Sequence, residues 1–306
     1  MELDIVYGSA TVTANGEMIE RELMMDVYRP SQNNADYTRS TSQSDGARPA
    51  VILVHGGAFQ RGGRRQPPYR EMGAVHSRME DYARLLAPLG YVCFVIEYRL
   101  APEFPVPETP LDAPWLLPMN RDLTDVGMAR VNFARNAMGL PPLLGDEGKT
   151  VVWQSILAAA EDLAMAVEFV RDNADTFQID PDRVAVGGHS AGGTTVINAV
   201  HGLNIPVAAA FPLSPPVAAI DLAQTINSPD ETPTLHVVAQ NDLPVIFERT
   251  PEFTEAMRRV GADYQLVWIP AFSHFYPHNA PSLADDGTRQ ALSERLIQFL
   301  ETHLTP

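Results

Sequence analysis

Cysteine is almost missing from this chain of 306 residues, which has one, Cys93, in the apolar run of residues 91–96. A single cysteine cannot form an intramolecular disulfide, so nothing in the sequence requires an oxidising compartment. We interpret Cys93 as a buried strand residue. The sequence also lacks an internal repeat, a long low-complexity tract, a dinucleotide fingerprint, a phosphate-binding glycine loop and a metal-ligand cluster, so we expect no cofactor and no metal.

Basic residues are scarce as well. The 22 Lys and Arg face 38 Asp and Glu, for a formal net charge of −16. Such a surface repels phosphate backbones and anionic lipid, so we expect no nucleic-acid partner and no membrane insertion. No apolar run approaches the ~20 residues that cross a bilayer. Residues 1–4 are acidic and precede no apolar segment typical of a signal peptide, so we expect a cytoplasmic protein. A homodimer is compatible with the sequence, which leaves the oligomeric state open.

The order of apolar segments predicts an α/β fold with a mostly parallel central sheet and helices on both faces. Several strand candidates are continuously apolar, as expected when both faces of a strand are covered. Strands are predicted at residues 50–54, 91–97, 184–187, 207–212, 234–239 and 265–269. An early hairpin is predicted from residues 4–14 and 19–28, with its turn at Asn15-Gly16. Helices are predicted at residues 77–89, 126–138, 155–177, 191–201, 251–260 and 282–304.

We predict a single domain, residues 1–306, with an insertion at about residues 108–150. Between residues 98 and 151 the sequence offers no convincing strand, yet it is rich in Pro, Leu, Met and Trp. A long segment of this kind inside a compact domain is usually a lid or binding loop, so we interpret residues 108–150 as a cap. A surface decoration is the alternative. The polar residues 31–48 are predicted to form an exposed loop.

A serine stands at a sharp turn in residues 187–193, which read GGHSAGG directly after an apolar strand candidate. The motif G-x-S-x-G is Gly188, His189, Ser190, Ala191 and Gly192. Small residues on both sides of a serine, between a strand and a helix, allow the chain to turn so that the hydroxyl is exposed. The pattern is typical of a nucleophile elbow, which makes Ser190 the candidate nucleophile.

An acid and a histidine follow Ser190 in the order that a serine triad on this fold requires. Asp242 lies just past the strand at residues 234–239, and His274 lies just past the strand at residues 265–269. His274 would accept the serine proton and return it to the leaving group, while Asp242 would orient the imidazole. Rival candidates fit the strand ends less well: Asp230, Glu231 and Glu248 for the acid, and His278 for the base.

Donors for an oxyanion are expected in two places. The strand at residues 50–54 runs into His55-Gly56-Gly57, where glycines let backbone N–H groups approach a substrate. Ala191, next to the candidate nucleophile at a helix start, would supply another N–H group. We interpret His55 as a residue that shapes this loop rather than as a catalyst.

Three motifs carry a resemblance to a known family: residues 55–59 (HGGAF), 97–105 (EYRLAPEFP) and 188–193 (GHSAGG). With them the chain resembles the hormone-sensitive-lipase-like esterase branch of the α/β-hydrolase superfamily. The resemblance covers residues 20–300 apart from the insertion. It implies the α/β-hydrolase fold, carboxylesterase activity and oxyanion donors on Gly57, Ala58 and Ala191. Two features depart from the family. Ala58 replaces a usual glycine and narrows the acyl side, and the segment after Pro110 is longer than usual, so substrate preferences transfer poorly.

The hypothesis is therefore a serine carboxylesterase that hydrolyses short-chain or small aromatic esters through an acyl-enzyme, with a small-molecule ester as partner. A peptidase or amidase of the same fold is the first alternative. A non-catalytic receptor on this scaffold is the second, although receptors of that kind lose a triad member. The basic loop of residues 61–65 could hold an anionic part of a substrate, seat the cap or lie in solvent. Four residues of the insertion line a pocket or pack a small core: Trp115, Leu116, Met119 and Met138.

Overall fold

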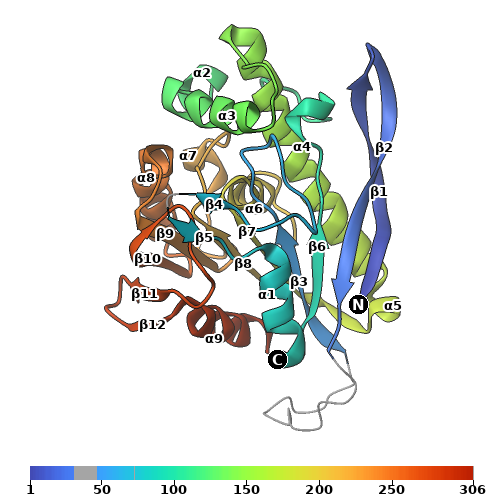
Figure 1. Ribbon diagram of the computed structural model, residues 1–306. Coiled ribbons are helices and arrows are strands. Elements are labelled where there is room, and N and C mark those ends of the chain that lie inside the picture. The colour runs from blue at the N-terminus through green and yellow to red at the C-terminus, as the bar shows by residue number, and fades with distance from the viewer. Residues whose placement is uncertain (31–46, 72, 306) are drawn as a thin grey trace.

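A parallel sheet forms the centre of the molecule in the computed structural model, which describes residues 1–30, 47–71 and 73–305 (Figure 1). Within these residues the strands form a ten-stranded sheet in the order β1-β2-β6-β3-β7-β8-β9-β10-β11-β12, and a separate pair, β4–β5. The strands from β6 to β10 in this order run parallel. Their bounds are β6 (Val92–Ile96), β3 (Arg48–Val54), β7 (Ile179–His189), β8 (Ala209–Leu213), β9 (Thr234–Asn241) and β10 (Tyr264–Ser273). The predicted parallel centre is confirmed.

Antiparallel hairpins extend the sheet at both edges. At one edge β1 (Glu2–Ala14) pairs with β2 (Glu17–Tyr28), and β2 pairs antiparallel with β6. The connecting residues Asn15 and Gly16 have φ of 53° and 82°, the left-handed values that a tight hairpin turn requires. The predicted early hairpin is thus confirmed, and in Figure 1 it lies along one side of the molecule.

Both faces of the central strands are buried, which explains why the sequence does not alternate there. In β3, Ile52 and Val54 belong to one hydrophobic cluster, while Val51 and Leu53 belong to another. The first cluster includes the helices α4 (Gly145–Asp172) and α6 (Ala191–His201). The second includes α1 (Met79–Leu86) and α9 (Leu292–Leu304). Helices therefore cover both faces, and the buried Cys93 lies in β6 as predicted.

The remaining elements are short or peripheral. The short strands are β4 (Arg70–Glu71), β5 (Ala74–Val75), β11 (Pro281–Ala284) and β12 (Arg289–Ala291). The other helices are α2 (Met119–Asp122), α3 (Asp125–Ala137), α5 (Ala174–Phe177), α7 (Leu222–Thr225) and α8 (Pro244–Val260). Single 3-10 turns are formed by Ala87–Leu89 and Ala101–Glu103.

The predicted helix at residues 282–304 is wrong in its first part. Residues Pro281–Ala284 and Arg289–Ala291 form the antiparallel strands β11 and β12, and the helix begins only at Leu292. A turn between the strands causes the difference. Gly287 has φ of 86°, and the carboxylate of Asp286 accepts the N–H group of Thr288 at 2.8 Å. This turn reverses the chain before a helix can start.

Two other helices begin earlier than predicted. Helix α8 starts at Pro244 and continues through Pro251, the residue at which the prediction began. Helix α4 starts at Gly145 rather than at residue 155 and runs for 28 residues. It is long and apolar enough to cross a membrane by length and composition alone, but 67% of its most apolar window is buried inside the protein. The predicted loop of residues 31–48 lies outside the described residues except for its last two.

Residues 108–150 contain α2, α3 and the start of α4, and they lie together at one end of the molecule (Figure 1). The segment is anchored at several points. The indole of Trp153 donates to the carbonyl oxygen of Leu111 at 3.1 Å. The buried carboxylate of Asp122 contacts the guanidinium of Arg249 on α8 at 3.2 Å. On the described part of this segment no strand forms, as predicted, apart from an isolated bridge between Leu116 and Ile220.

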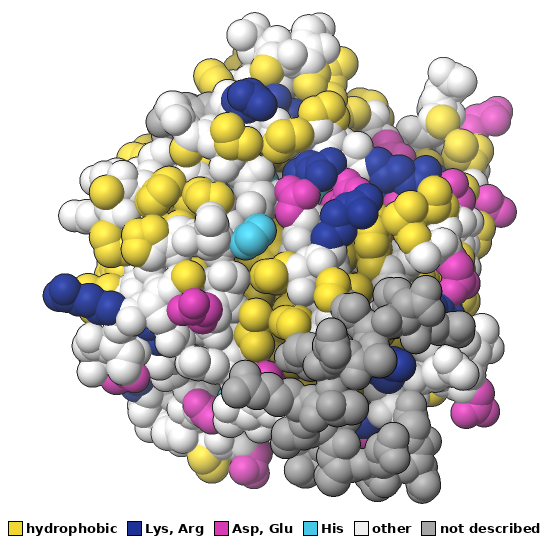
Figure 2. Space-filling model, turned by 60° about the horizontal axis from the view of Figure 1, so that its bottom comes forward, with side chains coloured by type: hydrophobic (Ala, Val, Ile, Leu, Met, Phe, Trp, Pro, Cys, Tyr) yellow, Lys and Arg dark blue, Asp and Glu magenta, His cyan; other side chains and the backbone are white. Residues whose placement is uncertain are grey.

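The surplus of acidic residues does not coat the surface evenly. Figure 2 shows a face on which basic side chains gather among acidic ones, while other acidic side chains are scattered singly between neutral and apolar areas. A net charge of −16 on the chain therefore coexists with local charge pairing.

Candidate active site

Ser190 lies at the junction of β7 and α6, at the carboxyl end of the parallel sheet. Its backbone has φ of 56° and ψ of −119°, a strained conformation for a residue with a side chain. The neighbouring glycines are required by close packing, because a Cβ atom on Gly188 would lie 2.5 Å from Gly192 and one on Gly192 would lie 2.1 Å from the Val54 carbonyl oxygen. The backbone N–H of Ser190 donates to the carbonyl oxygen of Leu213 at 2.8 Å. These contacts fix the predicted elbow.

The structure brings the three predicted residues into one hydrogen-bonded chain. His274 Nε2 lies 2.8 Å from Ser190 Oγ, and His274 Nδ1 lies 2.7 Å from Asp242 Oδ1. His274 and Asp242 are buried. Because the carboxylate can only accept, His274 carries its proton on Nδ1, which leaves Nε2 free to take the proton of Ser190. This geometry matches a nucleophile, a base and an orienting acid.

Asp242 accepts four hydrogen bonds. Besides His274, the donors are Ser214 Oγ at 2.5 Å, the Ala239 N–H at 3.0 Å and the Leu243 N–H at 2.8 Å. Burial acts against the charged carboxylate, but the hydrogen bonds from His274, Ser214 and the backbone outweigh it and hold the pKa of Asp242 below its ordinary value. Asp242 is therefore ionised and held in place at neutral pH.

A second pair of residues, which the sequence analysis did not single out, supports this carboxylate. Ser214 and Tyr276 are fully buried, and their oxygens lie 3.0 Å apart. Because the Ser214 hydroxyl donates to Asp242, it accepts from the Tyr276 hydroxyl. Ser214 directly follows β8, so its position after an apolar strand was the one signal in the sequence. That signal does not separate it from other loop serines.

The loop after β3 lies against the elbow. A Cβ atom on Gly56 would lie 2.7 Å from the carbonyl oxygen of His189 and 3.2 Å from Cβ of Ser190. Gly57 has φ of 135°, and Ala58 has φ of 56°. Ala191 is the first residue of α6, so its N–H has no acceptor within the helix. The three predicted oxyanion donors, Gly57, Ala58 and Ala191, thus lie on the two segments that meet at Ser190.

Contacts from residues 98–101 hold this loop in place. The buried hydroxyl of Tyr98 donates to the His55 carbonyl oxygen at 3.0 Å, and the Ala101 N–H donates to the Phe59 carbonyl oxygen at 2.8 Å. The ring of His55 stacks on Tyr98 at 4.4 Å, and burial lowers the pKa of His55 to about 4. His55 is therefore an uncharged residue in the packing of the loop, in line with its predicted role.

Arg99 anchors the same segment to α4. Its Nε donates to Asp162 Oδ1 at 2.9 Å, and both side chains are buried. Glu161 also contacts the guanidinium, at 3.1 Å. Burial raises the pKa of Asp162 to about 6, although the charge and hydrogen bonds of Arg99 act in the opposite direction. The motif at residues 97–105 thus links the loop after β3 to the long helix.

The space above Ser190 is small. A cavity of about 10 Å³ lies at the hydroxyl, roughly the volume that one water molecule needs. Arg130 and Ala134 of α3 line it from the side of residues 108–150. Its other lining residues come from the loops at the sheet: Gly57, Ala58, Arg61, Tyr69, His189, Ser190, His274 and Phe275. The insertion therefore contributes directly to the wall of the site.

The rival candidates lie elsewhere. Glu231 pairs with His201 at 3.1 Å, and Asp230 and Glu248 are exposed. The backbone N–H of His278 is bound by Ser77 Oγ at 2.9 Å, and its ring lies near Tyr82 rather than at Ser190. None of these four residues contacts the Ser190 hydroxyl in the described part of the chain.

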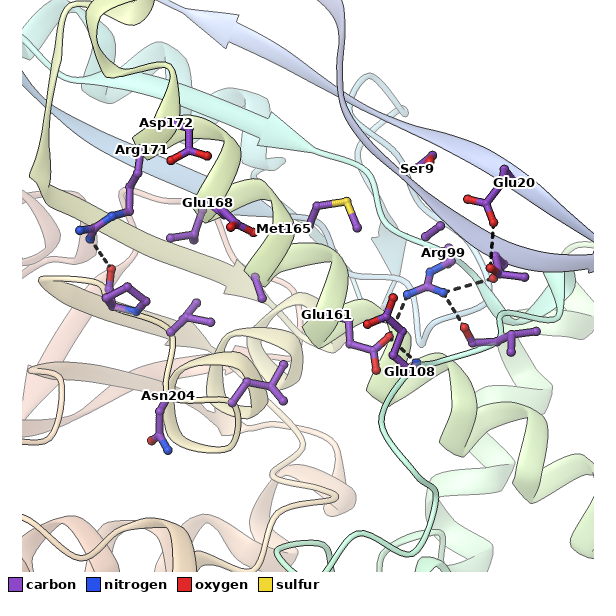
Figure 3. A pocket seen from close by; sticks show the side chains of 18 residues that line it. Ser9, Glu20, Arg99, Glu108, Glu161, Met165, Glu168, Arg171, Asp172 and Asn204 are labelled. Carbon is purple, nitrogen blue, oxygen red and sulfur yellow. Dashed lines mark hydrogen bonds and ion pairs between the residues drawn. The ribbon is translucent and has the colours of Figure 1, made fainter.

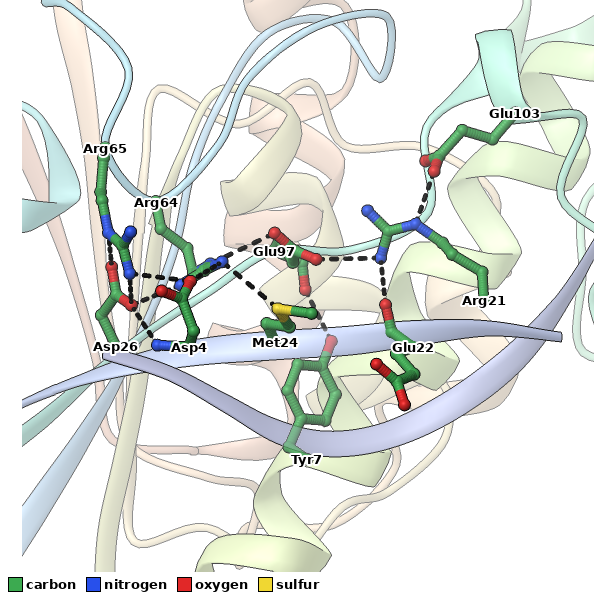
Figure 4. Close-up of polar contacts among 10 residues, drawn as sticks. All are labelled: Asp4, Tyr7, Arg21, Glu22, Met24, Asp26, Arg64, Arg65, Glu97 and Glu103. Carbon is green, nitrogen blue, oxygen red and sulfur yellow. Dashed lines mark hydrogen bonds and ion pairs between the residues drawn. The ribbon is translucent and has the colours of Figure 1, made fainter. Parts of the chain in front are cut away.

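The basic loop of residues 61–65 divides between two places. Arg61 lines the cavity, with its guanidinium 4.6 Å from the ring of Tyr69. Arg64 and Arg65 do not line it and instead reach Asp4 and Asp26 of the first hairpin (Figure 4). Arg65 Nε donates to Asp26 Oδ2 at 2.7 Å, and Arg64 also pairs with Asp26. The second half of the loop therefore ties the hairpin to the site and does not lie free in solvent.

A larger cavity, of about 620 Å³, lies between the first hairpin and α4 (Figure 3). Its labelled side chains are mainly charged, and Glu161 contacts Arg99 at 3.1 Å there. Ser190, Asp242 and His274 do not line it. The candidate chemistry is thus in the small cavity and not in the larger one.

No group of three or more His, Cys, Asp or Glu side chains that could hold a metal ion occurs among the residues that the structure describes.

Comparisons with known proteins agree with the topology. A family model described as BD-FAE matches residues 151–204, which run from α4 through the elbow and to just past the end of α6. Esterase 2 of Thermogutta terrifontis, phosphorylated by paraoxon, aligns with a TM-score of 0.57 and 16% identity over 99% of this chain and 95% of that chain. Its propionate-bound form aligns with a TM-score of 0.52 and 17% identity over 89% and 84%. A search of curated proteins gave no match.

The chain has the α/β-hydrolase fold, and the structural neighbours reported above are esterases. The fold implied by the three sequence motifs is confirmed.

Proposed function

We propose that this protein is a serine carboxylesterase that acts on short-chain or small aromatic esters through an acyl-enzyme. The observation that carries the proposal is the continuous chain of hydrogen bonds from Ser190 through His274 to Asp242, at 2.8 and 2.7 Å. The esterase neighbours, one of them with propionate bound, support the same reaction class.

In the proposed first step, Ser190 Oγ forms a bond to the ester carbonyl carbon while its proton passes to His274 Nε2. The carbonyl oxygen becomes an oxyanion, for which the N–H groups of Gly57, Ala58 and Ala191 are the donors. The carbon–oxygen bond to the alcohol then breaks, and His274 returns the proton to the departing alcohol oxygen. Asp242 stabilises the imidazolium throughout.

In the second step, water attacks the acyl carbon and gives its proton to His274 Nε2. The bond to Ser190 Oγ breaks, the proton moves to that oxygen, and the carboxylic acid leaves. The hydrogen bonds and charges that hold Asp242 ionised keep the imidazole in one orientation through both steps. No bound cofactor is needed in this sequence of steps.

The narrowness of the site supports a preference for small acyl groups. A cavity of about 10 Å³ leaves no room for a long chain unless the lining side chains move. We propose that residues 108–150 form a cap whose helix α3 limits the acyl group through Ala134 and Arg130. The Ala58 methyl narrows the same side. We also propose a cytoplasmic location.

The test is hydrolysis of p-nitrophenyl esters from acetate to palmitate, with Ser190→Ala as control. We expect a maximum at a short acyl chain and a loss of about 10⁶-fold in kcat for the variant. Equal activity of the two proteins would contradict the proposal. Turnover of p-nitroanilides in place of esters would instead favour the amidase alternative.

A further inference from the structure

His189, the residue before Ser190 in the G-x-S-x-G motif, has no role in the steps above, although it is buried at the centre of the site. Its Nε2 atom lies 2.9 Å from the carbonyl oxygen of His274. A carbonyl oxygen only accepts, so His189 donates from Nε2 and its Nδ1 atom carries no proton. The side chain is 1% exposed, and the contact is not open to water.

The surroundings of His189 keep it uncharged and fix its ring. Burial, and then the neighbouring His76 and His274, lower the pKa of His189 well below its ordinary value. Its ring centroid lies 3.9 Å from that of His76, 4.8 Å from that of His274 and 5.9 Å from that of Phe275. His189 therefore serves as a neutral donor with one orientation.

The position of this donor matters because of the residue that follows. Ser190 is bonded directly to His189, and its hydroxyl lies 2.8 Å from His274 Nε2. Residue 274 is thus held twice by the pair 189–190, through its side chain at Ser190 and through its main chain at His189. The flanking residues are held by the pairing of Ser273 with Asn241 and by the bond from the Ser77 N–H to the Tyr276 carbonyl oxygen, and His189 adds a contact at the carbonyl group of His274 itself. Ala271, three residues earlier, has a left-handed φ of 65°, and its N–H donates to Gln240 Oε1 at 2.8 Å.

We infer that His189 is a positioning residue, which fixes the main chain of His274 relative to Ser190 and so sets the distance between nucleophile and base. This inference rests on the proposed function of Ser190 and His274. It assigns His189 no proton transfer to substrate. Its effect is geometric: displacement of a reacting group by about 1 Å can cost about 100-fold in rate.

Two variants separate the hydrogen bond from the packing. His189→Phe keeps an aromatic ring of similar size and removes the donor. His189→Gln keeps an N–H group at a comparable distance from the main chain. His236→Phe is the matched control, because His236 is also fully buried and also makes a hydrogen bond, at 2.8 Å to the Tyr264 hydroxyl, away from Ser190. Thermal unfolding of each variant checks that it is folded.

Two measurements report on the reactivity of Ser190, which depends on its hydrogen bond to His274. The first is kcat and KM for p-nitrophenyl acetate. The second is the rate of labelling by an alkyl fluorophosphonate, in which Ser190 Oγ bonds to phosphorus, the phosphorus–fluorine bond breaks, fluoride leaves and the serine proton passes to His274. Labelling needs no knowledge of the natural ester.

We expect His189→Phe to lower kcat and the labelling rate by about 10- to 100-fold, with a smaller change in KM, because the variant disturbs the placement of the base relative to the nucleophile. His189→Gln should recover most of the rate, and His236→Phe should match the wild type in both measurements. The inference is overturned if folded His189→Phe labels as fast as the wild type, or if His189→Gln is as slow as His189→Phe. Labelling in the expected order, without any ester turnover by the wild type, would refute the esterase proposal and leave this inference standing.

Discussion

The small cavity at Ser190 is built by two regions that place their side chains in different ways. The first region is the set of loops that follow the parallel strands and carry Ser190, Asp242 and His274. The second region is residues 108–150, which contribute Arg130 and Ala134 from α3. In the first, each residue stands at the end of a strand whose neighbours fix it. In the second, a helix packs over the site from outside the sheet.

The contacts of the two regions differ accordingly. Asp242 accepts hydrogen bonds from four donors, and the Ser190 N–H is bound to the next strand. Helix α3 is joined to the loop after β3 by the side chain of Arg135, which donates to Gln60 Oε1 at 2.9 Å. We therefore propose that the strand ends carry the chemistry and that residues 108–150 control access to it. Substitutions in the first region should change kcat, and those in the second should change which esters enter.

The largest effect is expected at the acid of the strand-end region. Asp242→Asn should lower kcat by about 10⁴-fold, because the amide favours the wrong tautomer of His274 and removes the charge that stabilises the imidazolium. Steady-state kinetics with p-nitrophenyl acetate measure this. The control is Asp230→Asn, which changes an exposed rival carboxylate and should leave kcat unaltered. A larger loss for the Asp230 variant would mean that Asp230, and not Asp242, is the acid.

The next effect is expected in the loop after β3. A Cβ atom on Gly57 would lie 1.8 Å from the Arg61 carbonyl oxygen, and φ is 135°, so Gly57→Ala must displace the backbone. Loss of one oxyanion donor typically costs about 10²- to 10³-fold in kcat. Gly63→Ala in the same loop is the control, since its Cβ would meet no atom within 4 Å. Equal kcat for both variants would remove Gly57 from the oxyanion site.

A smaller effect is expected at Ser214, which donates to Asp242 at 2.5 Å. Ser214→Ala should lower kcat by about 10-fold, in line with a hydrogen bond to a charged group. The control is Ser155→Ala. It removes a buried hydroxyl that donates to the Val151 carbonyl oxygen within α4 and does not contact Asp242. If both variants lose the same activity, the effect reflects general loosening of the core and not support of the acid.

The second region is tested at Ala134, which is fully buried and lines the cavity. Ala134→Gly should raise the ratio of butyrate to acetate turnover by about four-fold, the value of one methylene of apolar contact. Ala129→Gly, on the exposed side of α3, carries the same cost in helix propensity and should leave the ratio unchanged. If Ala134→Gly lowered kcat for the acetate ester as much as Ser214→Ala does, α3 would affect the chemistry and not only the choice of ester.

The last effect is on the free energy of unfolding. We expect it to depend on pH through buried histidines of the strand region. Residues 108–150 contain no histidine, whereas His236 is buried within β9. Burial lowers the pKa of His236 to about 3, below the value near 6.5 of the unfolded chain. Protonation therefore favours unfolding, and the free energy of unfolding falls as the pH drops below 6.5. Urea titrations of the wild type and His236→Phe should show a difference that changes by about 1 kcal/mol between pH 7.5 and 6.0. A constant difference would mean that His236 binds a proton in the folded state.

The strand-end residues could be predicted from the sequence because parallel strands bring their carboxyl ends to one edge of the sheet. Ser190, Asp242 and His274 each follow a predicted strand, and this position, together with the elbow motif and the order of the three residues, was sufficient to predict that they meet. Ser214 follows such a segment as well, but its hydroxyl gains a role only through its contact with Asp242. That contact depends on the register of β8 and β9, which no local pattern specifies.

The parts that the sequence did not predict depend on turns and on packing. The reversal at Gly287 ended the expected helix at its start and produced β11 and β12. The volume of the cavity depends on how closely α3 approaches the loops, which is a property of the assembled core. His189 was visible only as a variable position of the elbow motif, and its bond to His274 joins residues 85 apart in sequence.

Helix α4 runs without interruption from residues 108–150 into the core, and this continuity constrains how the protein can change over evolution. Each residue of a helix turns the chain by about 100° and advances it by about 1.5 Å. An insertion or deletion of one residue near the start of α4 would therefore rotate everything before it relative to the sheet. Homologues of this protein should therefore differ in residues 108–150 by substitution and keep the length of α4 constant. A chimera that takes residues 108–150 from a relative would have to keep the number of residues in α4 unchanged where the two sequences are joined.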